Sequence, residues 1–146
     1  MKDTAVSAPS LDAQASGPAH AERALVLIVD DNQKNRKLAG DVLLAAGFRT
    51  LEAANGSDGI MLANMHLPNV ILMDLRLPDM DGTDAARKLA NEARTSKIPV
   101  VALSSLALEG DSAWLRGFGF AGYLEKPIDI REFPGQVRRY CSRRSG

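Results

Sequence analysis

Cysteine is almost absent from this sequence of 146 residues, in which Cys141 is the only one. A single cysteine excludes an intrachain disulfide and a zinc site built from cysteines. Long apolar runs are also missing: the longest, residues 24–29, is far shorter than the ~20 residues of a membrane-spanning helix. Because no apolar segment follows Lys2, the start does not resemble a signal peptide, and we expect a cytoplasmic protein without a membrane segment.

An excess of charge of either sign is lacking as well. The chain has 18 basic and 18 acidic residues, so its formal net charge is zero and gives no general case for binding nucleic acid. The charge is unevenly distributed, because residues 131–146 contain five arginines and one glutamate. Such a run is usually the solvated face of a helix.

Short apolar segments alternate with helical patterns after a polar start. We predict a disordered tail over residues 1–23, one domain over residues 24–142 and a short C-terminal tail over residues 143–146. Apolar runs and periodicity predict five strands and five helices in the domain. The strands are expected at residues 24–29, 48–53, 70–73, 98–103 and 120–124, and the helices at residues 35–46, 55–65, 83–94, 107–117 and from about 129 onwards.

The alternation of strands and helices predicts an α/β fold with a parallel sheet covered on both faces. Five units of this length suit the flavodoxin-like, doubly wound sheet with strand order 2-1-3-4-5. In such sheets the functional crevice lies beyond the carboxyl ends of the strands, where the strand order reverses between strands 1 and 3. We therefore expect the functional site at the ends of the first and third strands.

Three aspartates follow those two strands. Asp30 and Asp31 end the first strand and Asp74 ends the third, so their carboxylates should converge and raise one another's pKa values. A hard divalent cation relieves this repulsion, and Mg²⁺ favours carboxylate ligands together with water. Either Asp30 or Asp31 alone could instead cap the following helix. The three together favour a magnesium site.

Two further strand ends supply a hydroxyl and an ammonium group. Ser104 follows the fourth strand, and Lys126-Pro127 follows the fifth. Taken singly, Ser104 is more simply a turn residue and Lys126 a solvated lysine. Beside carboxylates and a metal, the pair makes a pocket that can stabilise a transferring phosphoryl group.

These motifs resemble the response regulator receiver family over roughly residues 24–142. The resemblance rests on Val-Asp-Asp-Asn at residues 29–32, Met-Asp-Leu-Arg-Leu-Pro-Asp-Met-Asp-Gly at residues 73–82, Ser104, Tyr123 and Lys126-Pro127. Asp-Asp-Asn-x-x-Asn at residues 30–35, Glu-Gly-Asp at 109–111 and Lys-Pro-Ile at 126–128 are similar to the single-domain DivK type and to the receivers of hybrid kinases.

The resemblance implies a single-domain response regulator of a two-component system or phosphorelay, and not an enzyme acting on other substrates. Asp74 would accept a phosphoryl group from a phosphohistidine of a histidine kinase or a histidine phosphotransfer protein. Asp31, Asp74 and the backbone carbonyl of Arg76 would bind Mg²⁺ directly, and Asp30 would act through water. Lys126 and Ser104 would bind the phosphoryl oxygens, Ser104 and Tyr123 would form the switch, and the Lys126–Pro127 peptide would be cis.

The output would be a contact with a downstream protein, with no role for nucleic acid or membrane. The expected partner surface runs from about residue 107 to 142 and includes Trp114, Arg138 and Arg139. Pro134-Gly135 interrupts the last helix, so a kink or a late start is expected there. Core packing is the default for an aromatic residue such as Trp114, which could also be a partner contact. Arg76 could either shield the acyl phosphate or point to solvent.

Other functions of related folds fit the sequence less well. An aspartate-nucleophile phosphatase would carry its second aspartate two residues after the first, whereas Asp30 and Asp31 are adjacent and residue 32 is Asn. A flavin protein would need a first loop that cradles phosphate, and Asp30-Asp31-Asn32 would repel it. The remaining alternative is a degenerate receiver that acts as an interaction module without phosphorylation.

Overall fold

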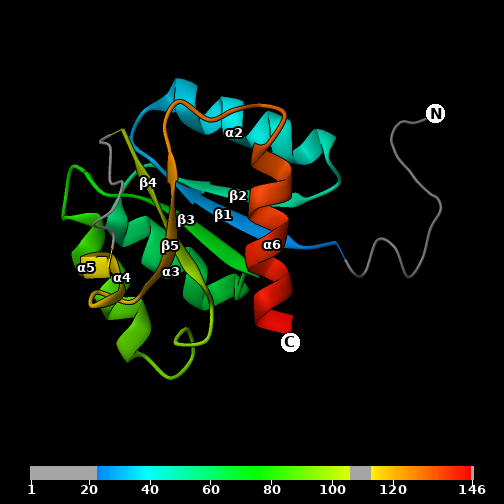
Figure 1. Cartoon of the computed structure of the whole chain (residues 1–146). Coiled ribbons are helices and arrows are strands. Elements are labelled where there is room, and N and C mark those ends of the chain that lie inside the picture. The colour runs from blue at the N-terminus through cyan, green and yellow to red at the C-terminus, as the bar shows by residue number, and fades with distance from the viewer. Residues whose placement is uncertain (1–22, 106–112, 146) are drawn as a thin grey trace.

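The computed structural model describes residues 23–105 and 113–145, in which strands and helices alternate along the chain (Figure 1). Residues 1–22 of the predicted N-terminal tail and most of the helix predicted at residues 107–117 lie outside the described residues. The elements are β1 (Leu25–Val29), α2 (Gln33–Ala45), β2 (Arg49–Ala53), α3 (Gly56–His66), β3 (Val70–Asp74), α4 (Gly82–Asn91), β4 (Val100–Ser104), α5 (Ala113–Arg116), β5 (Phe120–Glu125) and α6 (Phe133–Ser145).

The five strands form one parallel sheet with the order β2-β1-β3-β4-β5. This order confirms the predicted flavodoxin-like, doubly wound topology. The observed strand ends differ from the expected ones by at most two residues. Because β1 pairs with both β2 and β3, the order reverses between β1 and β3.

Helices cover both faces of the sheet, with α3, α4 and α5 on one face and α2 and α6 on the other. The central strands are buried on both faces, and alternate residues of β1 enter the two cores. Leu27 packs under α3 and α4, whereas Ile28 packs under α2 and α6. Full burial of a Leu or Ile side chain contributes roughly 1.5–3 kcal/mol, so these two cores hold the strand ends in place.

Asparagine side chains begin the first two helices. Asn32 Oδ1 accepts the N–H of Asn35, and Asn55 Oδ1 accepts the N–H of Asp58. The alternative in which Asp30 or Asp31 caps the first helix is therefore wrong, because Asn32 takes that position. The cap leaves both aspartates available for the site.

The last helix starts late, as expected from Pro134-Gly135. α6 begins at Phe133, whose side chain is fully buried, and Pro134 lies in the first turn, where a backbone N–H has no partner within the helix. In the turn before α6, the Asp129 carboxylate accepts the N–H of Arg131 at 2.9 Å. Over the described residues, no helix combines the length and the apolar character that crossing a membrane requires.

Candidate metal centre at the ends of β1 and β3

Three carboxylates converge where the strand order reverses. Asp30 and Asp31 follow β1, and Asp74 ends β3, which pairs with β1 so that Val29 lies opposite Met73. One oxygen from each of the three side chains lies within 4.8 Å of the other two. Asp30 is buried, Asp31 is exposed and Asp74 lies between these extremes. The predicted acidic cluster is therefore present, and its position follows from the sheet order.

Lys126 bridges two of these carboxylates from the end of β5. Its Nζ lies 2.9 Å from Asp30 Oδ2 and 2.8 Å from Asp74 Oδ2. The Lys126–Pro127 peptide is cis, as the resemblance implied. Three carboxylates face one ammonium group, and no hydrogen bond or ion pair joins the Asp31 side chain to another described residue. The cluster therefore remains strongly anionic.

The pKa values in the cluster record this balance. Burial raises the pKa of Asp74, and the hydrogen bonds from Lys126 and from the N–H of Arg76 oppose that effect without cancelling it. The negative charge of Asp30 raises the pKa of Asp74 further. Burial alone would lower the pKa of Lys126, but its hydrogen bonds to Asp30 and Asp74 outweigh burial and raise that pKa. Lys126 is therefore held firmly as a cation beside carboxylates that repel each other.

The backbone of Asp30 is held by two neighbouring elements. Its N–H donates to the carbonyl of Ala53 at 3.1 Å, and its carbonyl accepts Arg36 Nη1 at 2.8 Å. Arg36 also pairs through Nε with Glu52 Oε1 at 3.3 Å. Sequence reasoning missed Arg36, because a charged residue in the first turns of a helix usually faces solvent. The arginine orients the strand end rather than binding in the acidic cluster.

Ser104 and Tyr123 occupy the positions expected of them. Ser104 ends β4 and is buried, one residue beyond Leu103, which lies opposite Asp74. The Ser104 carbonyl accepts the N–H of Lys126 at 2.7 Å, so the ends of β4 and β5 are joined beside the cluster. Tyr123 lies on β5 opposite Ala102 and packs against the core under α3, α4 and α5.

The loop between β3 and α4 closes tightly on the end of β3. Asp74 Oδ1 accepts the N–H of Arg76 at 3.0 Å, and the Leu75 carbonyl accepts the N–H of Gly82 at 2.8 Å. A Cβ on Gly82 would overlap the Asp74 carbonyl oxygen and lie 2.9 Å from Leu75 Cα. Only glycine therefore allows the loop to return this close to Asp74.

Trp114, one of the expected partner residues, lies on the surface. Trp114 is 44% exposed and meets Phe118 edge to face, with ring centroids 6.0 Å apart. The guanidinium of Arg87 lies over the ring of Phe118, 4.7 Å from its centroid. Trp114 is thus an exposed aromatic residue rather than part of the core. Phe120, at the start of β5, is buried.

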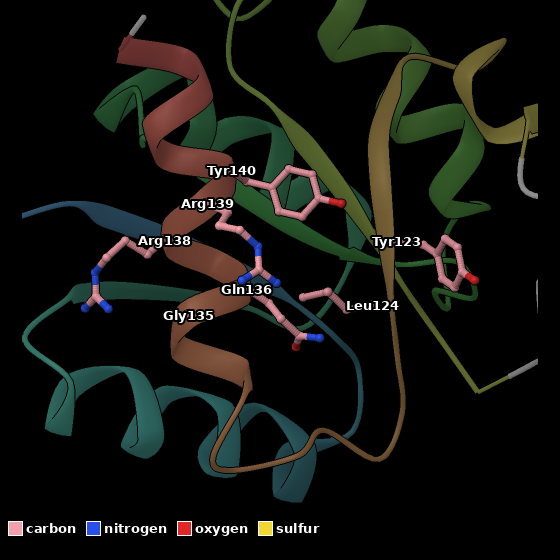
Figure 2. A pocket seen from close by; sticks show the side chains of 7 residues that line it. All are labelled: Tyr123, Leu124, Gly135, Gln136, Arg138, Arg139 and Tyr140. Atoms are coloured by element: carbon pink, nitrogen blue, oxygen red, sulfur yellow. The ribbon is translucent and has the colours of Figure 1, made fainter.

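A groove of about 700 Å³ lies between β5 and α6 (Figure 2). Gln136, Arg139 and Tyr140 extend from α6 toward β5, whereas Arg138 points to the other side of the helix. Arg138 donates to the carbonyl of Ala46 at 3.2 Å and lies over the ring of Phe48. Both arginines line the groove, and Arg138 in addition joins α6 to the end of α2.

The chemistry of the acidic cluster fits a magnesium ion. Its side-chain donors are carboxylate oxygens only, the ligand type that hard divalent cations prefer. Asp31, Asp74 and the backbone carbonyl of Arg76 would hold the ion, with Asp30 behind them. A bound cation would neutralise the charge that Lys126 leaves uncompensated.

Comparisons with known proteins agree with this geometry. The family model of the response regulator receiver domain matches residues 26–138. The polar-differentiation response regulator DivK of Brucella anthropi is 36% identical over 115 residues, which cover 79% of this chain and 94% of that relative. DivK of Brucella ovis is 35% identical over the same length.

Solved structures show the same arrangement of the chain. The receiver domain of a sensor histidine kinase from Pseudomonas aeruginosa, which has magnesium coordinated in its active-site cleft, superposes with a TM-score of 0.74. It is 30% identical, and the match covers 82% of this chain and 98% of that one. The chemotaxis response regulator CheY4 of Vibrio cholerae shares the fold, with a TM-score of 0.76 at 24% identity over 81% of this chain and 98% of that one.

Proposed function

The chain belongs to the response regulator receiver domain family, a family of signalling domains rather than classical enzymes, and from this premise we propose that Asp74 is its phosphoacceptor. The phosphoryl group would come from a phosphohistidine of a histidine kinase or a histidine phosphotransfer protein. The observation that carries the proposal is the position of Asp74, which ends the central strand and shares Lys126 with the buried Asp30. Phosphohistidine donors are made in the cytoplasm, where ATP is available, so we place the protein there.

The residues around Asp74 suit a transfer between nitrogen and oxygen. A carboxylate oxygen of Asp74 forms the bond to phosphorus as the phosphorus–nitrogen bond of the donor breaks, and the electron pair of that bond stays with the imidazole. Lys126 stands 2.8 Å from Asp74 Oδ2, where an ammonium can bind a phosphoryl oxygen. The hydroxyl of Ser104 would bind another of these oxygens from the end of β4.

Mg²⁺ would be held by Asp31, Asp74 and the Arg76 carbonyl, and when bound it would neutralise charge on the phosphoryl oxygens. Asp30 would stay behind the metal ligands. Burial of Asp30 and its contact with Lys126 keep that lysine directed at the site. Each of these roles belongs to a residue at or just beyond the carboxyl end of a strand.

Phosphorylation by a small donor tests the proposal directly. With acetyl phosphate and Mg²⁺, we expect one phosphoryl group per chain, located on Asp74 by mass spectrometry of peptides trapped with borohydride. With a chelator in excess, modification should fall to the background level. A protein that stays unmodified with Mg²⁺ present would contradict the proposal and favour a degenerate receiver that acts only through binding.

The output would be a changed contact with a downstream protein, as proposed for the surface around α5, β5 and α6. Tyr123 would link this surface to the site. It lies on β5 opposite Ala102 of β4, two residues before Ser104, and packs against the core under α3, α4 and α5. The groove between β5 and α6 and the exposed Trp114 offer an aromatic anchor and an arginine to a partner.

Charge reversal on α6 separates binding from folding. Arg139→Glu should weaken binding of the phosphorylated protein to its target while leaving phosphorylation of Asp74 unchanged, because Arg139 lines the groove. Arg138→Glu should also destabilise the fold, since Arg138 lines the groove and donates to the carbonyl of Ala46 as well. A pull-down with and without a phosphoryl mimic, together with thermal unfolding, distinguishes the two variants. Equal loss of binding in both variants at equal stability would contradict this assignment.

A further inference from the structure

The loop that carries the proposed metal ligand Arg76 is attached to a second element at its tip. Asp79 Oδ1 accepts the N–H of Gly56 at 2.8 Å, and Asp79 Oδ2 accepts the N–H of Ser57 at 2.9 Å. Gly56 and Ser57 are the first two residues of α3. One carboxylate from the loop between β3 and α4 therefore binds the start of a helix more than 20 residues earlier in the chain.

The start of α3 is divided between two caps. Asn55, the helix's own cap, accepts the N–H of Asp58, and its carbonyl accepts that of Gly59. This leaves the N–H groups of Gly56 and Ser57 without partners inside the helix. Asp79 satisfies both, and these bonds hold its pKa below the ordinary value, so it stays ionised. The loop thus supplies the partner of two N–H groups at the start of α3.

Contacts at both ends define the position of this loop. At its base, the Leu75 carbonyl accepts the N–H of Gly82, and Arg76 forms a β-bridge with Asp81. At its tip, Met80 lies where a side chain on Gly56 would stand, since a Cβ there would come within 2.7 Å of the Met80 sulfur. That apolar contact has little directional preference. The two hydrogen bonds of Asp79 are directional, so they determine how the tip of the loop is oriented on α3.

We propose that Asp79 is a positioning residue, which fixes the loop between β3 and α4 on the first turn of α3 and thereby sets the affinity of the acidic cluster for Mg²⁺. The inference rests on the proposed function, because the loop supplies the Arg76 carbonyl. It adds a residue that touches neither metal nor phosphoryl group. The contacts of Asp79 link α3 to the loop, while the N–H of Asp30 on the carbonyl of Ala53 links the end of β2 to the cluster. The loop after β3 and the residue after β1 are thereby both attached to the segment that joins β2 to α3.

Three variants test this role, with Mg²⁺ alone as the first probe. Asp79→Ala should raise the dissociation constant for Mg²⁺ by about 10-fold, the lower end of the range for groups that support metal ligands. Asp79→Asn keeps one acceptor oxygen and should show a smaller rise. Asn55→Ala is the matched control, because it removes a cap from the same helix start and leaves the loop attachment intact. Its magnesium affinity should stay within about twofold of the wild type, well inside the effect expected for a supporting group.

A second readout separates positioning from general loss of structure. At low Mg²⁺, Asp79→Ala should be phosphorylated by acetyl phosphate more slowly than the wild type, and saturating Mg²⁺ should restore the rate. The amide signals of Gly56 and Ser57 should shift in nuclear magnetic resonance spectra of metal-free Asp79→Asn, which reports the lost bonds independently of activity.

The possible outcomes are distinct. If Asp79→Ala binds Mg²⁺ as the wild type does, or if Asn55→Ala weakens binding equally, Asp79 has no positioning role beyond helix stability, and the inference is overturned. If the wild type itself binds no Mg²⁺, the proposed function fails, and the inference fails with it. A rate that saturating Mg²⁺ cannot restore would also overturn the inference.

Discussion

Replacing Asp74 by Asn is expected to abolish phosphorylation while the protein stays folded. The amide has the shape of the carboxylate but supplies no nucleophilic oxygen, and Lys126 keeps Asp30 as its partner. The change also removes a charge that burial and Asp30 disfavour. The free energy of unfolding of the metal-free protein should therefore change by less than about 1 kcal/mol or rise slightly.

The measurements are mass spectrometry after treatment with acetyl phosphate and Mg²⁺, and urea unfolding without metal. Asp41→Asn is the matched control, because Asp41 is an exposed carboxylate on α2 that pairs with Lys37, away from the site. It should be phosphorylated as the wild type is. A phosphoryl group found on Ser104 or any residue other than Asp74 in the wild type would sink the assignment.

The raised pKa of Asp74 can be checked in the metal-free protein. Because burial raises that pKa above 3.8, the Asp74 carboxyl group should take up a proton at a higher pH than an ordinary aspartate does. The measurement is a pH titration of the Asp74 carboxyl carbon by nuclear magnetic resonance without Mg²⁺. A carboxyl group that titrates at or below pH 3.8 would contradict the raised value.

Replacing Lys126 by Ala is expected to destabilise the metal-free protein strongly. The substitution leaves Asp30 and Asp74, whose side chains are 2% and 13% exposed, without their shared cation. Breaking a buried ion pair in this way costs about 3 kcal/mol at the lower end of the observed range, which suits an ammonium that keeps some contact with water. Phosphorylation should persist at a reduced rate, and the response of the partner surface should be blunted.

Magnesium should restore much of the lost stability in Lys126→Ala. The ion binds the folded cluster and not the unfolded chain, so it stabilises by linkage, and without the ammonium it meets no competing cation at Asp74. The increase in unfolding temperature on adding Mg²⁺ should therefore be larger in the variant than in the wild type. Lys37→Ala is the control, because its exposed pair with Asp41 contributes less than about 1 kcal/mol. Equal stability of Lys126→Ala and the wild type without metal would contradict the prediction.

The difference between wild type and Lys126→Ala also depends on pH. The pKa of Lys126 is raised on folding above 10.5, so its contribution to stability is fully present below pH 10.5 and is lost as the pH rises through the folded-state value. The stability difference should shrink at strongly alkaline pH. It should also shrink at acid pH, where Asp74 becomes protonated and no longer needs a cation.

Local patterns in the sequence determined the fold and the main members of the site. The apolar run that becomes β1, buried on both faces, and the alternation of strands with helices predict a parallel sheet. Parallel strands bring their carboxyl ends to one edge, so Asp30, Asp31 and Asp74 could be placed together from their positions at strand ends alone. Strand order also predicts Ser104 and Lys126 at that edge.

Tertiary structure alone decided which side chains hold one another. In the sequence, Asp79 is one of several polar residues in a loop, and only the fold shows that its carboxylate binds the start of α3. Arg138 is one of several arginines near the C-terminus, and only the packing of α6 shows that it donates to the carbonyl of Ala46, 92 residues earlier. Lys126 is shared by Asp30 and Asp74 rather than paired with one. Periodicity reports which face of an element is buried, because burial follows the local spacing of apolar residues. Hydrogen bonds and ion pairs depend on distances between elements that are far apart in the chain, and those distances arise only when both layers of helices have packed on the sheet.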